Sequence, residues 1–244
     1  MISLFSHAAI RNCLFFTLLL PASAVGQNNK NDSNISIASY SAAVHEQQPV
    51  FYGSEYVRTV LPISKGSIFF HSNQVSSGNV RYAGRYFQNI PLIYDQLADE
   101  LCTRPIQGMS LLRLFTPKVD SFSLHGARFV RVDVNQEGLR SGYWQVTHEG
   151  ACMLLEKELK KIVEVLQVAS PYSVIIDSKT IHLVKIGDTY QRISRKSDLA
   201  NVFQEERESI QSYLKSNRRK FRKLPLREAL QAVAIHYESL KEKR

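Results

Sequence analysis

Apolar and polar positions alternate in short runs through the middle of the chain, which is typical of strands with one buried face. The alternation is clearest in Phe122 and Leu124, and again from Phe129 to Val134. The strands predicted on this basis cover residues 51–61, 67–72, 79–82, 86–94, 111–115, 119–124, 128–134, 143–147, 174–176, 181–186 and 190–194.

A short phrase recurs five times among these strands. A bulky apolar or aromatic residue leads into a glycine, and another bulky residue or a cysteine follows within three positions. The copies lie at residues 52–56, 82–86, 124–129, 146–152 and 186–190. Glycine accepts the positive φ of a tight turn, and the flanking residues suit a half-buried pleated surface. The phrases therefore predict an antiparallel β-meander, as a curved sheet or a partly open barrel.

Two stretches fit both helix and strand. In residues 90–101, Ile90, Tyr94 and Leu97 form a helical stripe, although Leu92 and Tyr94 also alternate. Residues 151–167 are rich in Leu, Glu and Lys, which favour helix.

The end of the chain has a different character, because no glycine follows Gly187. Ser197 and Asp198 suit the cap of a short helix through Phe203, and residues 205–217 carry one apolar face. After Pro225, apolar residues recur at helical spacing: Leu226, Leu230, Val233, Tyr237 and Leu240. We therefore expect a mainly β fold with two to three C-terminal helices.

The first 24 residues have the features of a signal peptide. Arg11 precedes a short apolar core, Pro21 breaks it, and Ala22-Ser23-Ala24 resembles a cleavage site. An uncleaved anchor is the alternative, although the apolar run is short for a membrane span. We expect export to the periplasm, the outer membrane or the cell surface, with no transmembrane segment in the mature chain. The predicted organisation is a signal peptide at 1–24, a flexible leader at 25–48, a β domain at 49–194 and a basic helical region at 195–244.

Two cysteines, Cys102 and Cys152, remain in the expected mature chain. An exported protein can join them in a bridge, which would add about 4 kcal/mol of stability by constraining the unfolded chain. Two buried thiols on separate strands are the alternative, and the sequence leaves both open.

Several segments resemble a set of uncharacterised exported proteins of Bacteroidota-type bacteria. The segments that carry the resemblance are 82–86, 90–95, 122–129, 142–146, 150–157, 190–194, 197–199, 212–214, 220–223 and 236–237. It covers most of residues 51–240, and the group has no established activity. The resemblance implies that residues 151–159 form a strand, against their helix propensity, and it implies no catalytic residue.

An acidic group is the first candidate for chemistry. Asp95, Asp99 and Glu100 lie close together in sequence beside Tyr94. Paired carboxylates can act as general acid and base, or can bind a hard cation such as calcium. The structural alternative is a turn in which Asp bonds to its own backbone.

Other catalytic and metal-binding patterns are absent from the sequence. His125 and His148 stand beside turn glycines and His182 lies in a predicted strand, without the spacing of a zinc site. Neither a serine-nucleophile motif nor a phosphate-binding loop occurs. We expect no catalytic residue, no metal and no cofactor.

Positive charge concentrates at the C-terminus. Residues 191–244 contain 14 Lys or Arg and 7 Asp or Glu, a net charge of +7 out of +9 for the chain. The candidate binding residues surround Phe221: Lys215, Arg218, Arg219, Lys220, Arg222 and Lys223. Export argues against nucleic acid as the partner, and anionic lipid or glycan fits the compartment better. A solvated connection between helices, with Phe221 packed inward, is the structural alternative.

These features favour a non-enzymatic envelope protein. Its sheet and basic tail would bind a partner protein, a glycan or a lipid. One alternative is a carrier of a lipid or small apolar ligand, lined by Phe69, Phe70, Phe87, Tyr94, Phe115 and Trp144. Another is a hydrolase that uses Asp95, Asp99 or Glu100.

Overall fold

The computed structural model describes residues 49–57, 62–105, 108–133, 139–164 and 174–242. The predicted signal peptide at 1–24 and the leader at 25–48 lie outside the described residues.

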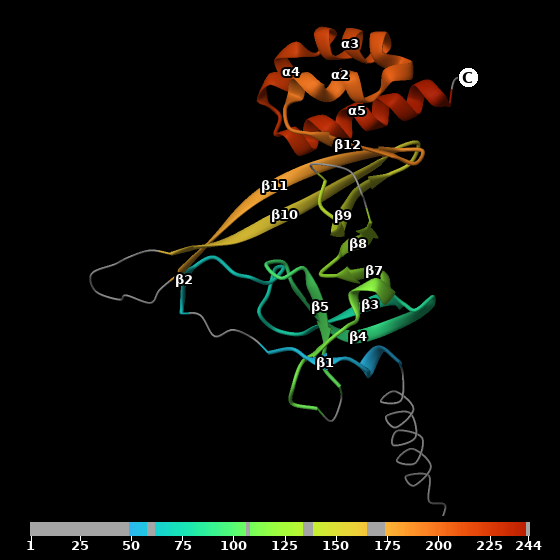
Figure 1. Ribbon diagram of the computed structural model, residues 1–244. Coiled ribbons are helices and arrows are strands. Elements are labelled where there is room, and N and C mark those ends of the chain that lie inside the picture. Colours follow the sequence, from blue (N-terminus) through green and yellow to red (C-terminus); the bar gives the residue numbers. More distant parts are fainter. Residues whose placement is uncertain (1–48, 58–61, 106–107, 134–138, 165–173, 243–244) are drawn as a thin grey trace, which may run out of the picture. The chain divides into compact units, whose positions relative to one another are not determined.

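The described strands form one twelve-stranded sheet (Figure 1). They are β1 (Ser54–Glu55), β2 (Ile63–Lys65), β3 (Ser76–Tyr82), β4 (Arg85–Asp95), β5 (Glu100–Thr103), β6 (Leu112–Arg113), β7 (Val119–Leu124), β8 (Ala127–Val132), β9 (Gly142–Glu149), β10 (Met153–Glu164), β11 (Val174–Ile186) and β12 (Thr189–Ile193). Their order is β1-β6-β5-β4-β3-β7-β8-β9-β10-β11-β12, with antiparallel neighbours throughout, and β2 pairs in parallel with β11. Strands β1 and β12 end the order and are not paired with each other, so the described sheet is open. The predicted β-meander with C-terminal helices is confirmed.

Three of the five glycine phrases form tight hairpin turns. Gly84, Gly126 and Gly187 have φ of +75°, +74° and +56° in the β3–β4, β7–β8 and β11–β12 turns. The first phrase is different, because Gly53 lies before β1 and joins no paired strands. A Cβ on Gly53 would lie 2.2 Å from the carbonyl oxygen of Arg113, so this glycine permits a close backbone approach.

Both ambiguous stretches are mainly strand in the part that the structure describes; residues 165–167 of the second stretch lie outside it. Residues 90–95 end β4 and residues 100–101 begin β5, with a turn between them. Residues 153–164 form β10, which pairs with β11 along its whole length. Strand pairing therefore outweighs the helix propensity of this segment. The separate strands predicted at 174–176 and 181–186 are one strand, β11.

The prediction of a strand at residues 67–72 is wrong. Only Phe69 pairs there, in an isolated bridge with Asp95. The ammonium of Lys160 instead donates hydrogen bonds to two carbonyl oxygens of this segment, those of Ser67 at 2.8 Å and Phe69 at 2.9 Å.

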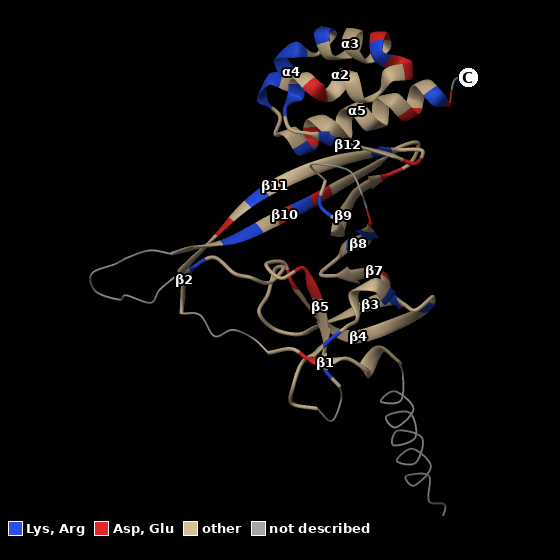
Figure 2. Ribbon diagram, viewed as in Figure 1, with Lys and Arg blue, Asp and Glu red and all other residues tan. Residues whose placement is uncertain are grey.

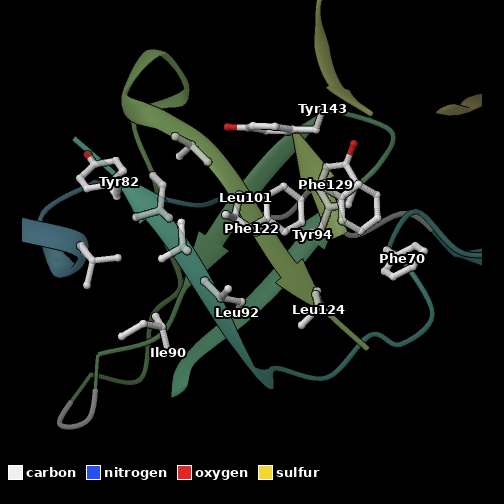
Figure 3. Close-up of a cluster of buried hydrophobic side chains, with 14 of the residues drawn as sticks. Phe70, Tyr82, Ile90, Leu92, Tyr94, Leu101, Phe122, Leu124, Phe129 and Tyr143 are labelled. Atoms are coloured by element: carbon white, nitrogen blue, oxygen red, sulfur yellow. The ribbon is translucent and has the colours of Figure 1, made fainter. Parts of the chain in front are cut away.

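An aromatic cluster fills the core between the first strands (Figure 3). Phe122 and Phe129 stack with ring centroids 4.7 Å apart; Tyr94 meets both of them edge to face, and Tyr143 meets Phe122 in the same way. These geometries suit the ring quadrupoles and add to the burial of apolar surface. Figure 3 shows Tyr94, Phe122, Phe129 and Tyr143 close together.

The C-terminal region contains four described α-helices, where two to three were expected. They are α2 (Leu199–Val202), α3 (Arg207–Ser216), α4 (Arg218–Lys223) and α5 (Leu226–Lys241). The helix that was not expected is α4. Its segment had been considered, as one alternative, to be a solvated connection between helices. Leu154, Val184 and Ile193 of the sheet share a buried cluster with the helices, including Phe221 and Tyr237. None of the described helices combines the length and the apolar character needed to cross a membrane.

Candidate functional site

Asp95 is a structural residue of the turn between β4 and β5. Its Oδ1 accepts hydrogen bonds from the backbone N–H groups of Leu97 at 2.8 Å and Ala98 at 2.9 Å. The hydroxyl of Tyr56 donates to its Oδ2 at 2.5 Å, and burial, followed by this contact, raises the pKa of Tyr56. The turn alternative considered for Asp95 is therefore confirmed.

Asp99 makes an ion pair with Lys157 of β10. The carboxylate lies 2.6 Å from the Lys157 ammonium and accepts a hydrogen bond from the Tyr94 hydroxyl at 2.6 Å. Burial lowers the pKa of Lys157, and the nearby Asp99 opposes that shift. Gly142 is required here, because a Cβ at its φ of +124° would lie 1.8 Å from Asp99 Oδ2.

Glu100 pairs with a third group, Arg113 of β6, at 2.7 Å. Asp95, Asp99 and Glu100 thus have three different partners. Asp95 and Glu100 are opposite each other on β4 and β5 and both line one cavity of about 210 Å³, whereas Asp99 pairs with Lys157, so the three carboxylates do not form a single group.

The three candidate histidines also have separate surroundings. His125 is exposed in the β7–β8 turn, as expected. His148 Nε2 lies 2.8 Å from Glu238 Oε1 of α5, so this residue links the sheet to a helix. His182 Nδ1 lies 3.5 Å from Glu156 Oε2. Within the described ranges, no three His, Cys, Asp or Glu side chains are grouped to hold a metal ion.

Cys102 and Cys152 are free thiols in different buried clusters. Burial raises the pKa of each thiol to about 12, so both are protonated at neutral pH. The alternative of two buried thiols is the one observed.

The aromatic residues considered as a cavity lining do not form one group, although Phe70, Phe87 and Tyr94 share one cluster and Phe70 and Tyr94 line a small cavity of about 60 Å³. Phe69, Tyr94 and Trp144 belong to three different buried clusters, and the Phe115 side chain is exposed. The mainly apolar cavity of about 210 Å³ has none of these six aromatic residues in its lining, which includes Tyr56, Ile63 and the carboxylates Asp95 and Glu100.

The candidate binding residues gather on α4 and the end of α3. Five of the six residues of α4 are Lys or Arg, and the sixth is the buried Phe221. Figure 2 shows this concentration of basic residues at α4. No Asp or Glu occurs between Glu208 and Glu228.

Helix geometry explains how α4 presents its charges. At 100° per residue, Arg219 and Lys223 lie about 160° from Phe221, while Lys220 and Arg222 lie about 100° from it. Phe221 packs edge to face on Tyr213 at 5.5 Å and belongs to the core shared by the helices and the sheet. Burial of this one ring therefore directs the basic side chains outward.

The six basic side chains are all exposed, and within the described chain none of them has an ion-pair partner: Lys215, Arg218, Arg219, Lys220, Arg222 and Lys223. Like charges at i, i+4, such as Arg218 with Arg222 and Arg219 with Lys223, disfavour a helix by about 0.2–0.5 kcal/mol per pair. The Lys196 ammonium compensates in part by donating to the Phe221 carbonyl at 2.9 Å.

An open hollow of about 650 Å³ is lined by Arg219, Lys220, Arg222 and Lys223. Guanidinium and ammonium groups can bind phosphate, sulfate or carboxylate oxygens there, with the forked donors of arginine able to bind two oxygens at once. We name these six side chains, Lys215 and the five of α4, the basic patch.

Sequence reasoning missed two residues that organise the fold, Lys157 and Glu238. Lys157 had a usable signal, because it occupies the position between Leu155 and Leu159 on the same strand face. Glu238 had none, since its partner His148 lies 90 residues earlier. Comparison of this chain with protein-family models, curated protein sequences and solved structures finds no match.

Proposed function

We propose that this chain is an exported, non-enzymatic envelope protein that attaches to an anionic surface through the basic patch. The observation that carries the proposal is a short helix with five exposed cations that have no ion-pair partner among the described residues, in a stretch of sequence without Asp or Glu from 209 to 227. Each of the acidic candidates, in contrast, holds a structural partner. Binding is therefore better supported than catalysis.

An anionic phospholipid surface is the partner that fits the patch best. Clusters of four to eight Lys or Arg on a helix suit anionic headgroups, and each contributes about 1 kcal/mol near such a surface. The exposed large apolar residues of the described chain all lie outside α4; Ile235 of α5 is the one found in a helix. Attachment is therefore electrostatic, without insertion of an apolar side chain into the bilayer.

Sedimentation with lipid vesicles tests this function. The mature protein should bind vesicles that contain phosphatidylglycerol and should not bind pure phosphatidylcholine. The variant R219Q/K220Q/R222Q/K223Q should bind anionic vesicles roughly 1000-fold more weakly, because four contributions of about 1 kcal/mol are lost.

A matched control removes the same charge elsewhere. Arg81, Arg85, Lys118 and Lys179 are exposed and have no ion pair within the described chain. The variant R81Q/R85Q/K118Q/K179Q should keep most of the affinity if the patch, and not the net charge, binds. Equal losses in the two variants would contradict a local site. Binding to an acidic polysaccharide but not to vesicles, with the same dependence on α4, would identify a glycan as the partner.

A further inference from the structure

Two exposed histidines from distant parts of the sequence lie side by side. His71 lies in the connection between β2 and β3, and His125 lies in the turn between β7 and β8. Their ring centroids are 5.6 Å apart, with ring planes inclined by 36°. The sequence singled out His125 as a turn residue but gave no reason to connect it with His71.

The ring of Phe70 lies beside both imidazoles. Its ring meets His71 edge to face at 4.5 Å and lies 6.2 Å from His125. Phe70 in turn packs edge to face on Phe129 of the aromatic core at 4.9 Å. The two histidines are therefore held beside each other by a buried side chain.

Both histidines have a left-handed backbone, with φ of 56° for His71 and 50° for His125. This conformation is uncommon for residues other than glycine, and Asn or Asp accepts it as readily as His. The equivalent turn between β3 and β4 uses Ala83 at φ of 51°. The turn itself thus does not require an imidazole at either position.

We propose that His71 and His125 together bind one divalent transition-metal ion through their imidazole nitrogens. With metal–nitrogen bonds of about 2 Å and a near-tetrahedral angle, two coordinated imidazoles place their ring centroids about 5 Å apart. The observed centroid separation of 5.6 Å is close to this value. Copper(II) should bind more tightly than zinc(II), following the usual order for nitrogen ligands. The remaining coordination positions are left to water or to an external ligand.

Copper titration of the mature protein, purified without a polyhistidine tag, tests the site. We expect one tightly bound copper(II) per chain, and an electron paramagnetic resonance spectrum with hyperfine splitting from two nitrogens. H71N and H125N should each weaken binding by roughly 100-fold, because one imidazole alone loses the advantage of a tethered pair. The double variant, which keeps neither imidazole, should bind copper at least as weakly as the weaker single variant. Zinc competition should displace copper only at higher concentration.

Two controls make the result specific. H45N changes a histidine of the predicted leader, and H236N changes an imidazole stacked on Tyr213; both should bind copper as the unaltered protein does. If H125N fails to fold, copper-induced broadening of the His71 and His125 imidazole signals in the unaltered protein replaces it. Copper affinity unchanged in the folded double variant, or broadening confined to other histidines, would overturn the proposal.

Discussion

Charged residues behave in opposite ways in strand β10 and helix α4. In β10, Lys157 pairs with Asp99, Lys160 donates to two carbonyl oxygens, and Glu156 lies near His182 and Arg227. In α4, five cations point into solvent with no acidic partner among the described residues. The number of charges is similar, but only those of β10 are joined to the rest of the molecule.

The difference separates charge that maintains the fold from charge available to a partner. A buried ion is costly unless it is paired, so removal of one partner in β10 should destabilise the protein. An exposed, unpaired cation contributes little to stability, so its removal should affect binding alone.

The largest expected effect follows from breaking the Lys157–Asp99 pair. Asp99→Asn should lower the free energy of unfolding by about 4 kcal/mol, because the buried ammonium of Lys157 loses its counter-ion. Urea unfolding measures the loss. K157M/D99N should be more stable than D99N alone, since no charge is then left unpaired. Equal stability of D99N and the unaltered protein would contradict a structural role for this pair.

A matched exposed pair provides the control. Lys161 and Asp177 lie on β10 and β11 at 3.2 Å, with 68% and 53% of their side chains exposed. Asp177→Asn should cost less than about 1 kcal/mol, because solvent screens the pair.

The next effect concerns the glycine beside Asp99. Gly142→Ala should destabilise the protein by about 2 kcal/mol or more, because its Cβ would overlap the carboxylate at an already unfavourable φ. Gly126→Ala shares a positive φ but meets nothing within 4 Å, and should cost about 1 kcal/mol from backbone strain alone. Thermal unfolding compares the two; a larger loss in Gly126→Ala would show that the contact with Asp99 is unimportant.

A smaller effect depends on pH. Burial lowers the pKa of His182 below its ordinary value of 6.5, with the nearby Glu156 opposing the shift. Below pH 6.5 the unfolded chain therefore binds a proton that the folded chain resists. The contribution of neutral His182 to stability is present above pH 6.5, and it is lost as the pH falls from 6.5 through the lower pKa of the folded state. His182→Gln should flatten the decline in unfolding free energy between pH 7 and pH 5, and an unchanged slope would count against this residue as its source.

The smallest effect on stability is expected at the basic patch. R219Q/K220Q/R222Q/K223Q should raise the free energy of unfolding by a few tenths of a kcal/mol, because like-charge pairs on α4 are removed. A fall of more than about 1 kcal/mol would mean that these charges maintain the fold, and the contrast with β10 would fail.

Local patterns were enough to predict most of the fold. Alternation located β7 and β12 to within a residue or so, and the glycine turns of three hairpins followed from φ > 0 alone. No regular strand forms at 67–72; the carbonyls of Ser67 and Phe69 accept hydrogen bonds from Lys160, a contact that no local pattern encodes. Helix α4 was missed because like charges repel one another along it, although Lys and Arg favour helix; burial of Phe221 and the hydrogen bond from Lys196 help to stabilise it.

The candidate sites also differ in how well the sequence could predict them. The basic patch was predictable, because exposed charge needs no knowledge of distant partners. The carboxylates at 95–100 were not, since their roles depend on Tyr56, Lys157 and Arg113, which come from three other strands or loops. Sequence proximity predicted one shared site; Asp95 and Glu100 do line one cavity, while the ion pair with Lys157 separates Asp99 from them.

Binding of the mature protein to phosphatidylglycerol vesicles at low and high salt tests the central claim most directly. Raising the salt from about 0.1 M to about 1 M shortens the screening length from about 10 Å to about 3 Å. We expect the unaltered protein to bind at low salt and dissociate at high salt, and the α4 variant, equally well folded, to bind at neither. Salt-insensitive binding, or equal binding by the α4 variant, would contradict the account.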